Sequence, residues 1–186
     1  WVKLPSMAHG TKFLFRWADQ NPPVNDTTAV WTNYVSVWHL DDDSAVQADS
    51  SSKAINATLS GTGTYTLGAG KVGLGMNKSS SLSTAADYMT LSGMGNGAST
   101  VSGWFYWPKH TASQQYAHPF MLGSWGAGGW YAEFNSNVSV LKFINNNAIT
   151  TINNTGITTS EDWVHLTVTY TGSKVNVYFN GNEALK

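Results

Sequence analysis

The clearest pattern in the chain is an alternation of apolar and polar residues near its C-terminus. One alternating run covers residues 163–170, a second covers 175–179, and Thr171-Gly172-Ser173-Lys174 separates them. A period of two is typical of a β-strand with one buried face, and Gly and Ser between two such runs favour a turn. We therefore predict a β-hairpin here, followed by a second tight turn at Asn180-Gly181.

Shorter runs of the same kind recur along most of the chain. Clusters of Gly, Ser and Asn separate predicted strands at 35–40, 56–59, 88–91, 100–107, 120–122, 130–134, 138–143 and 148–152. No apolar stripe with a 3.6-residue period runs long enough to predict a helix. Closely spaced short strands without helices predict an all-β antiparallel sandwich or jelly roll.

The first 33 residues have a different organisation. Two predicted strands, 1–4 and 12–17, flank a turn, and Asn21-Pro22-Pro23 then ends regular structure. A hairpin alone is marginal in water. We therefore expect it to pack on the main domain or to be the tail of an upstream β-domain. The predicted organisation is a β-hairpin and linker over 1–33 and a sandwich over 34–186.

Composition narrows the classes of function. Charged residues make up only 11% of the chain, while aromatic residues, including nine Trp, make up 13%. Hydroxyl and amide side chains replace charges on the surface, which is common in extracellular β-proteins. The net charge of −1, without a basic stripe, argues against nucleic-acid binding. No apolar run approaches the ~20 residues that span a bilayer, so membrane insertion is not expected.

The chain has no cysteine, which excludes disulfides and thiolate metal sites. A secreted protein without cysteine is more typical of prokaryotic surface proteins than of animal ectodomains. The predicted location is therefore extracellular or on the cell surface, and the predicted source is prokaryotic.

Seven segments carry a family resemblance through their order. They are Val37-Trp38-His39-Leu40, the loop 49–59, Gly70-Lys71-Val72-Gly73, 87–91, Thr100-Val101-Ser102-Gly103-Trp104, 163–170 and Tyr178-Phe179-Asn180-Gly181. In this order they resemble the laminin-G-like, or concanavalin A-like lectin/glucanase, jelly roll of bacteria. The resemblance implies a jelly-roll β-sandwich that binds a ligand. It also implies that the last strand of the domain is missing, which would leave a sheet edge open.

The N-terminal 33 residues resemble the end of a small β-domain that precedes such jelly rolls in prokaryotic surface proteins. Trp1-Val2-Lys3-Leu4-Pro5 carries this likeness. It supports the interpretation of residues 1–33 as the tail of an upstream domain.

A calcium site is expected in the loop that follows residue 40. Calcium prefers several oxygen ligands, and the resemblance implies an ion at the sandwich rim with Asp49 as a ligand. Asn56 and Asp43 offer further oxygens nearby in sequence. The alternative is that Asp49 forms an Asx turn and that Asp43 belongs to a solvated bend.

Aromatic residues supply the other candidate site. Trp38, Trp104 and Trp163 lie in predicted strands, and we expect them in the core. The Gly-rich segment 123–131 carries rings that we expect to be exposed and to stack on sugars. The predicted ligand-binding residues are Trp125, Trp130, Tyr131, Tyr116 and His118. The alternatives are that the rings fold inward to cap the sandwich or that they form a protein interface.

Catalysis is not expected. Retaining glycosidases need two carboxylates roughly 5 Å apart, usually from alternating positions of one strand. The three glutamates, Glu133, Glu161 and Glu183, each lack a second acid two residues away within a strand. The resulting prediction is a non-catalytic binding or adhesion module whose partner is a glycan or a neighbouring surface protein. The alternative is a structural subunit of a prokaryotic filament, adhesin or surface layer that self-assembles through an open sheet edge.

Overall fold

Strands account for nearly all the regular structure of the described residues. The computed structural model describes residues 27–60, 65–78, 88–91, 97, 99–107, 117–122, 129–134, 140–145, 148–153 and 162–185. Its elements are α1 (Thr27–Val30), β1 (Val46–Gln47), β2 (Ala57–Ser60), β3 (Tyr65–Ala69), β4 (Leu74–Lys78), β5 (Tyr88–Leu91), β6 (Ser99–Trp107), β7 (Ala117–Leu122), β8 (Trp130–Phe134), β9 (Val140–Asn145), β10 (Ala148–Asn153), β11 (Asp162–Tyr170), β12 (Val175–Phe179) and β13 (Asn182–Leu185).

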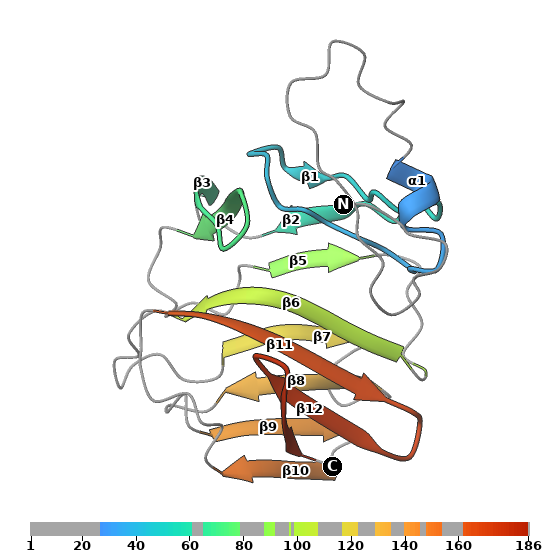
Figure 1. Cartoon of the computed structure of the whole chain (residues 1–186), viewed down its shortest axis with the longest axis vertical. Helices are drawn as coiled ribbons and strands as arrows, with labels where there is room; N and C mark the ends of the chain where they lie inside the picture. Colours follow the sequence, from blue (N-terminus) through green and yellow to red (C-terminus); the bar gives the residue numbers. More distant parts are fainter. Residues whose placement is uncertain are drawn as a thin grey trace, which may run out of the picture.

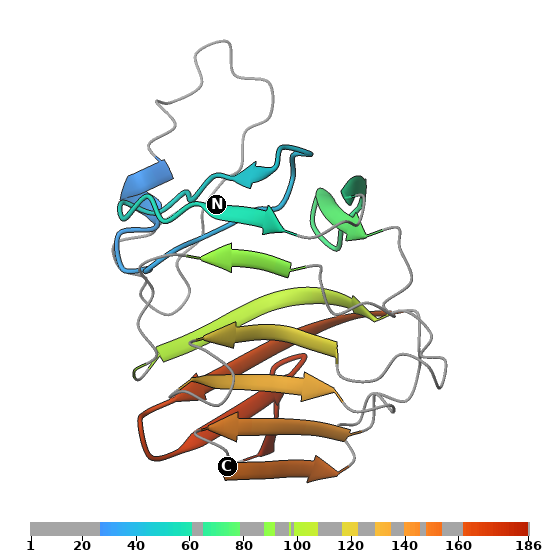
Figure 2. The ribbon, with the colours of Figure 1, turned by 180° about the vertical axis from the view of Figure 1, so that it is seen from behind.

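Two four-stranded antiparallel sheets form a sandwich. One sheet has the order β13-β12-β11-β6 and the other has the order β10-β9-β8-β7. In Figure 1 strands β11 and β12 lie in front of β8 and β9, and in Figure 2, seen from behind, β7 to β10 come to the front. The predicted all-β sandwich is confirmed.

The core fills the space between these sheets. Among the described side chains, alternate residues of β8, β9, β11 and β12 point inward, and those of the core are apolar. The buried set consists of Leu122, Trp130, Ala132, Leu141, Phe143, Val164, Leu166, Val168, Val177 and Phe179. Trp130 is completely buried, and its ring centroid lies 5.5 Å from those of Phe120, Phe143 and Tyr170.

The C-terminal hairpin forms as its sequence pattern predicts. Tyr170 pairs with Val175 across the turn, where Gly172 has a φ of 92°. Asn180 and Gly181 have φ values of 50° and 81°, so both residues of the following two-residue turn are left-handed. Asn-Gly is the preferred pair for such a turn because these residues tolerate positive φ.

Two smaller sheets complete the described fold. Strands β1, β2 and β5 form a three-stranded sheet, and β5 lies next to β6 in both views (Figures 1 and 2). Strands β3 and β4 form a hairpin whose turn is closed by a 2.9 Å hydrogen bond from Gly70 N to Gly73 O. A Cβ on Gly70 would approach Leu74 O to 2.6 Å, so this turn needs a glycine.

The strand predicted at 35–40 is wrong. These residues join no sheet, because the loop around Asp49 takes their hydrogen bonds instead. Val37 N donates to the Asp49 carboxylate at 2.8 Å, and Ser50 N donates to Val37 O at 2.9 Å. Leu40 then turns the chain with a φ of 57°. Strands β1, β3, β4 and β13 and the short helix α1 were not predicted. The predicted N-terminal strands lie outside the described residues.

Candidate functional site

An aromatic cluster lies on the outer face of the β13-β12-β11-β6 sheet. Val101 and Phe105 of β6 and Val164 and Leu166 of β11 pack into the core. Residues an odd number of positions away from them on the same strand therefore point outward. The β6–β11 register sets Trp104 opposite His165 and Tyr106 opposite Trp163. We call these four residues the aromatic platform.

The rings of the aromatic platform form two contacting pairs. The centroids of Trp104 and His165 are 4.9 Å apart with an interplanar angle of 60°, and those of Tyr106 and Trp163 are 5.5 Å apart at 62°. Such tilted pairs are favourable for aromatic quadrupoles. The side chains nevertheless remain open to solvent, since Trp104 is 42% exposed and Tyr106 is 48% exposed.

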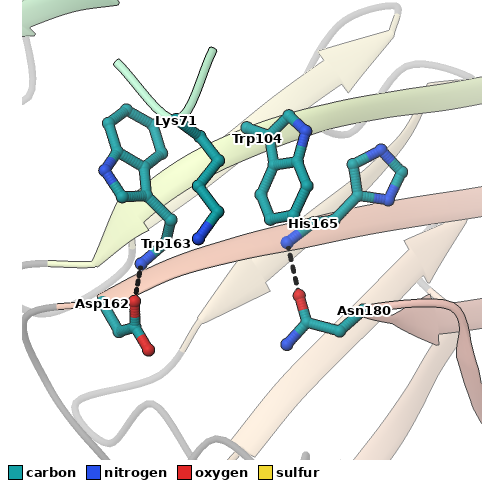
Figure 3. A pocket seen from close by; sticks show the side chains of 6 residues that line it. All are labelled: Lys71, Trp104, Asp162, Trp163, His165 and Asn180. Carbon is teal, nitrogen blue, oxygen red and sulfur yellow. Dashed lines mark hydrogen bonds between the residues drawn. The ribbon is translucent and has the colours of Figure 1, made fainter. Parts of the chain in front are cut away.

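The β3–β4 hairpin reaches over one end of the platform. Lys71, at its turn, places Nζ 5.5 Å from the centroid of the Trp104 ring, a cation–π contact. A Cβ on Gly75 would lie 3.6 Å from the indole of Trp163, so the hairpin backbone passes close to that ring. Figure 3 shows Lys71 between the indoles of Trp104 and Trp163.

Three residues of the platform and their polar neighbours line a hollow of about 440 Å³. Its lining residues are Lys71, Trp104, Asp162, Trp163, His165 and Asn180 (Figure 3). The volume lies within the ~300–1,000 Å³ typical of small-molecule sites. The hollow therefore combines large apolar rings with a few polar groups.

The polar side chains of the hollow are held by backbone hydrogen bonds. Asp162 Oδ1 accepts from Trp163 N at 2.7 Å, and Asn180 Oδ1 accepts from His165 N at 2.9 Å. Asn180 N also donates to His165 O at 2.9 Å, which fixes the turn against β11. These bonds use Oδ1 of each side chain. Asp162 Oδ2 and Asn180 Nδ2 are then the atoms that each can offer to a ligand.

His165 is positioned from its other side by hydroxyl groups. Its Nε2 lies 3.2 Å from Ser102 Oγ, which lies 3.0 Å from Thr167 Oγ1. These contacts and the Trp104 ring fix the imidazole in one orientation, so it forms a rigid part of the platform.

Two of the predicted ligand-binding rings are buried, and the structure contradicts their predicted role. Trp130 is fully buried between the sheets and Tyr131 is only 5% exposed, so neither presents a ring face to a sugar. Burial and the nearby charge of Glu133 both raise the pKa of Tyr131. His118 belongs to β7, but its side chain lies outside the described residues, as do Trp125 and Tyr116.

The core positions predicted for Trp104 and Trp163 are wrong. In β6, Trp104 shares its face with Ser102, and in β11, Trp163 shares its face with His165 and Thr167. Side chains alternate between the two faces of a strand, and Trp163 is adjacent in sequence to the apolar Val164. This alternation is the signal in the sequence that could have placed the indoles outside. Trp38 is half-buried and donates from Nε1 to Ile55 O at 2.9 Å.

The Asp49 loop is organised by the carboxylate of Asp49. Its Oδ1 accepts from Val37 N at 2.8 Å and from Ser51 N at 2.7 Å. Its Oδ2 accepts from Ser51 Oγ at 2.7 Å and from Ile55 N at 2.8 Å. Partial burial would raise the pKa of Asp49, but these hydrogen bonds outweigh it and hold the pKa below its ordinary 3.8. This arrangement favours the Asx turn over the calcium ligand.

The other two predicted calcium ligands contribute differently. Asn56 Oδ1 accepts from Asp49 N at 3.0 Å, and Asp43 is exposed. Within the described ranges there is no group of three or more His, Cys, Asp or Glu residues that could hold a metal ion. Calcium at this loop stays a prediction.

Glu133 lies on the opposite outer face of the sandwich. It is 3% exposed, and one of its carboxylate oxygens is 3.6 Å from Lys142 Nζ. Because its neighbours Trp130 and Ala132 point into the core, Glu133 points away from the aromatic platform. It is therefore not an acid of the hollow.

Comparison with protein families identifies this fold. A profile described as the concanavalin A-like lectin/glucanases superfamily matches residues 78–186. The chain belongs to this superfamily. The match includes β5 to β13, and therefore both main sheets of the superfamily domain and all four platform residues. No curated protein and no solved structure matched the chain. The predicted domain boundary at residue 34 stays a prediction.

No helix within the described ranges has the length and apolarity required to cross a membrane.

Proposed function

We propose that this superfamily domain is a carbohydrate-binding module that holds a glycan on the aromatic platform. The observation that carries the proposal is the half-exposed ring of Trp104 in the lining of the hollow, with the half-exposed ring of Tyr106 in the neighbouring row of the same face. Sugars present apolar C–H faces that stack on indole and phenol rings. The platform is already ordered by its own ring contacts, so binding does not have to immobilise these side chains.

The polar groups around the rings would give the site its selectivity. Asp162 supplies a carboxylate acceptor and Asn180 an amide donor, both from the margin of the hollow (Figure 3). Their Oδ1 atoms are tied to the backbone, which sets the direction of the remaining polar atom. A ligand hydroxyl that reaches these atoms exchanges its hydrogen bonds to water for hydrogen bonds to the protein. A hydroxyl in another position loses its bonds to water without such a replacement, which lowers the affinity.

The hollow supports binding without hydrolysis. Glycoside hydrolysis needs two carboxyl groups that flank the scissile bond. Asp162 is the single carboxylate among the residues that line the hollow, and Glu133 lies on the other face of the sandwich. We therefore propose a non-catalytic module. Incubation with a bound polysaccharide should release no reducing ends.

We further propose that the module works outside the cell or at its surface, in adhesion to glycan-bearing structures. The low fraction of charged residues and the absence of cysteine support this location. Calcium at the Asp49 loop is not required for glycan contact, because none of the residues of that loop lines the hollow.

Affinity electrophoresis tests the proposal. The protein is run through native gels that contain a mixed-linkage glucan, a xylan, a galactomannan or a soluble chitin derivative. We expect retardation by at least one of them and near-normal mobility for Trp104→Ala, with an affinity loss of about tenfold or more, or ~1.4 kcal/mol. Met121→Ala, at an apolar position of similar exposure on the other sheet, is the control. Equal retardation of both variants would refute the site.

The self-assembly alternative has less support from the described sheet. At the C-terminal edge of the β13-β12-β11-β6 sheet, strand β13 has four residues and carries the exposed Glu183. A short edge and a charged side chain both oppose pairing with another chain.

A further inference from the structure

The outer face of β6 and β11 continues beyond the aromatic platform. We infer, on the basis of the proposed function, that the ligand is an uncharged linear polysaccharide that lies along these two strands. Two or more sugar residues of this chain would contact the aromatic platform. The sugar residues that follow them would contact the hydroxyl side chains beside the platform.

The register of the two strands creates four successive rows on this face. The paired residues are Tyr106–Trp163, Trp104–His165, Ser102–Thr167 and Thr100–Thr169. The first two rows are aromatic and the last two carry only hydroxyl groups. We call the last two the hydroxyl rows.

The spacing of the rows requires a ligand longer than one sugar. Side chains on one face of a strand repeat every second residue, so neighbouring rows are ~7 Å apart. A single pyranose ring is shorter than this spacing and cannot cover both aromatic pairs. Since both pairs are open to solvent, with Trp104 and Tyr106 half-exposed, a chain that spans them gains more than a monosaccharide does.

The hydroxyl rows match the chemistry of the next sugar residues. Ser102 and Thr100 are exposed, and Thr167 and Thr169 are half-buried. Each hydroxyl group both donates and accepts, as sugar hydroxyls do. The Ser102–Thr167 pair, with its oxygens 3.0 Å apart, presents two such groups side by side.

The charge of the face indicates an uncharged ligand. The outward positions of β6 and β11 in the four rows carry no Asp, Glu, Lys or Arg. The charged residues of the hollow are Lys71 and Asp162, which have opposite signs. Both lie at the aromatic end of this face. A polyanionic chain would find no row of cations to match its charges, and it would have to lose hydration without compensation.

A ladder of oligosaccharides tests the chain path. The probes are cello- and xylo-oligosaccharides of one to six residues, whose chains are extended and uncharged, titrated by isothermal calorimetry. We expect affinity to rise through at least four residues. An affinity that stops rising before four residues would overturn the path but leave the proposed function standing. No binding of either ladder would overturn the path, and it would overturn the proposed function as well if none of the four gel polysaccharides retards the protein.

Paired variants locate the hydroxyl rows. The double variant Thr100→Val, Thr169→Val should weaken hexasaccharide binding by about two- to tenfold and leave disaccharide binding unchanged, since a neutral hydrogen bond contributes ~0.5–1.5 kcal/mol. Thr58→Val, at an exposed strand position of another sheet, is the matched control. An unchanged hexasaccharide affinity would contradict the path.

Two cellulose derivatives test the charge of the ligand. Tighter binding of the anionic carboxymethyl cellulose than of the neutral hydroxyethyl cellulose would contradict the inference that the ligand is uncharged.

Discussion

Trp130 and Trp104 are both strand residues of this sandwich, but they face opposite ways. Trp130 is enclosed by Phe120, Phe143 and Tyr170, whereas Trp104 borders solvent and Lys71. The indole nitrogen of Trp130 is buried and, within the described part of the chain, has no hydrogen-bond partner. Trp130 therefore stabilises the fold through its volume, and Trp104 is available to a ligand.

Substitutions at Trp130 should separate ring volume from the indole N–H. Trp130→Ala should lower the free energy of unfolding by ~3–5 kcal/mol because it leaves a cavity. Trp130→Phe should cost much less, because it keeps an aromatic ring and removes a buried donor without a partner. Urea denaturation of both variants measures the difference. An equal loss in the two would show that the N–H group has a partner.

Asp49 should stabilise its loop in a pH-dependent way. Asp49→Ala should lower the free energy of unfolding by ~1–3 kcal/mol at neutral pH, because it removes the acceptor for Val37, Ser51 and Ile55. The pKa of Asp49 is lowered in the folded state, so this stability is fully present above its ordinary pKa of 3.8. It should be lost as the pH falls through the lower folded pKa.

Denaturation curves at several pH values check this, with Asp43→Ala as the exposed control. If the difference in free energy of unfolding between Asp49→Ala and wild type stays constant down to the most acidic pH, the role assigned to Asp49 is contradicted.

The same denaturation curves, recorded with and without a chelator, test whether calcium binds the loop. If calcium stabilises the loop, a chelator should lower the free energy of unfolding of the wild type but not of Asp49→Ala. Because both carboxylate oxygens of Asp49 already accept hydrogen bonds, we expect the chelator to have no effect.

At the scale of elements, the C-terminal hairpin could be predicted because its pattern is local. Alternation marks β11 and β12, and Asn180-Gly181 supplies the residues that a left-handed turn needs. The β3–β4 hairpin could not be predicted, because Gly68 in β3 and Gly75 in β4 interrupt the alternation of apolar and polar residues. Residues 35–40 alternate like a strand, but the distant Asp49 side chain takes their hydrogen bonds.

The same reasoning explains why the candidate site was misplaced. Their position in predicted strands that resemble the family favours the core for Trp104 and Trp163, although strand parity sets both among polar residues. The contact of Lys71 with Trp104 joins segments distant in sequence, and no local pattern predicts it.

The β3–β4 hairpin should control access to the rings. A Cβ on Gly70 would meet Leu74 O at 2.6 Å, so Gly70→Ala should open the turn and move Lys71 from Trp104. Faster hydrogen exchange in residues 65–78 and altered tryptophan fluorescence should follow, while the core strands keep their protection. Gly97→Ala is the control, since a Cβ there meets nothing within 4 Å. Unchanged exchange in the Gly70 variant would show that the turn tolerates the side chain.

The whole molecule is a two-sheet sandwich with chemically different outer faces. One face carries exposed rings and hydroxyls, and the other carries the buried Glu133 beside the half-buried Lys142. Binding through the first face does not require the sheet edge. We therefore expect the protein to remain monomeric over a wide concentration range in light scattering. Growth of polymers with concentration, without any response to glycan, would favour the assembly alternative.

The most direct measurement of the central claim is nuclear magnetic resonance of the tryptophan indole N–H groups during titration with the polysaccharide that retards the protein. The signals are assigned by single substitutions. The aromatic platform predicts that Trp104 and Trp163 shift on binding while the buried Trp130 does not. Binding that leaves Trp104 and Trp163 unchanged and shifts another indole, such as Trp125, would contradict it.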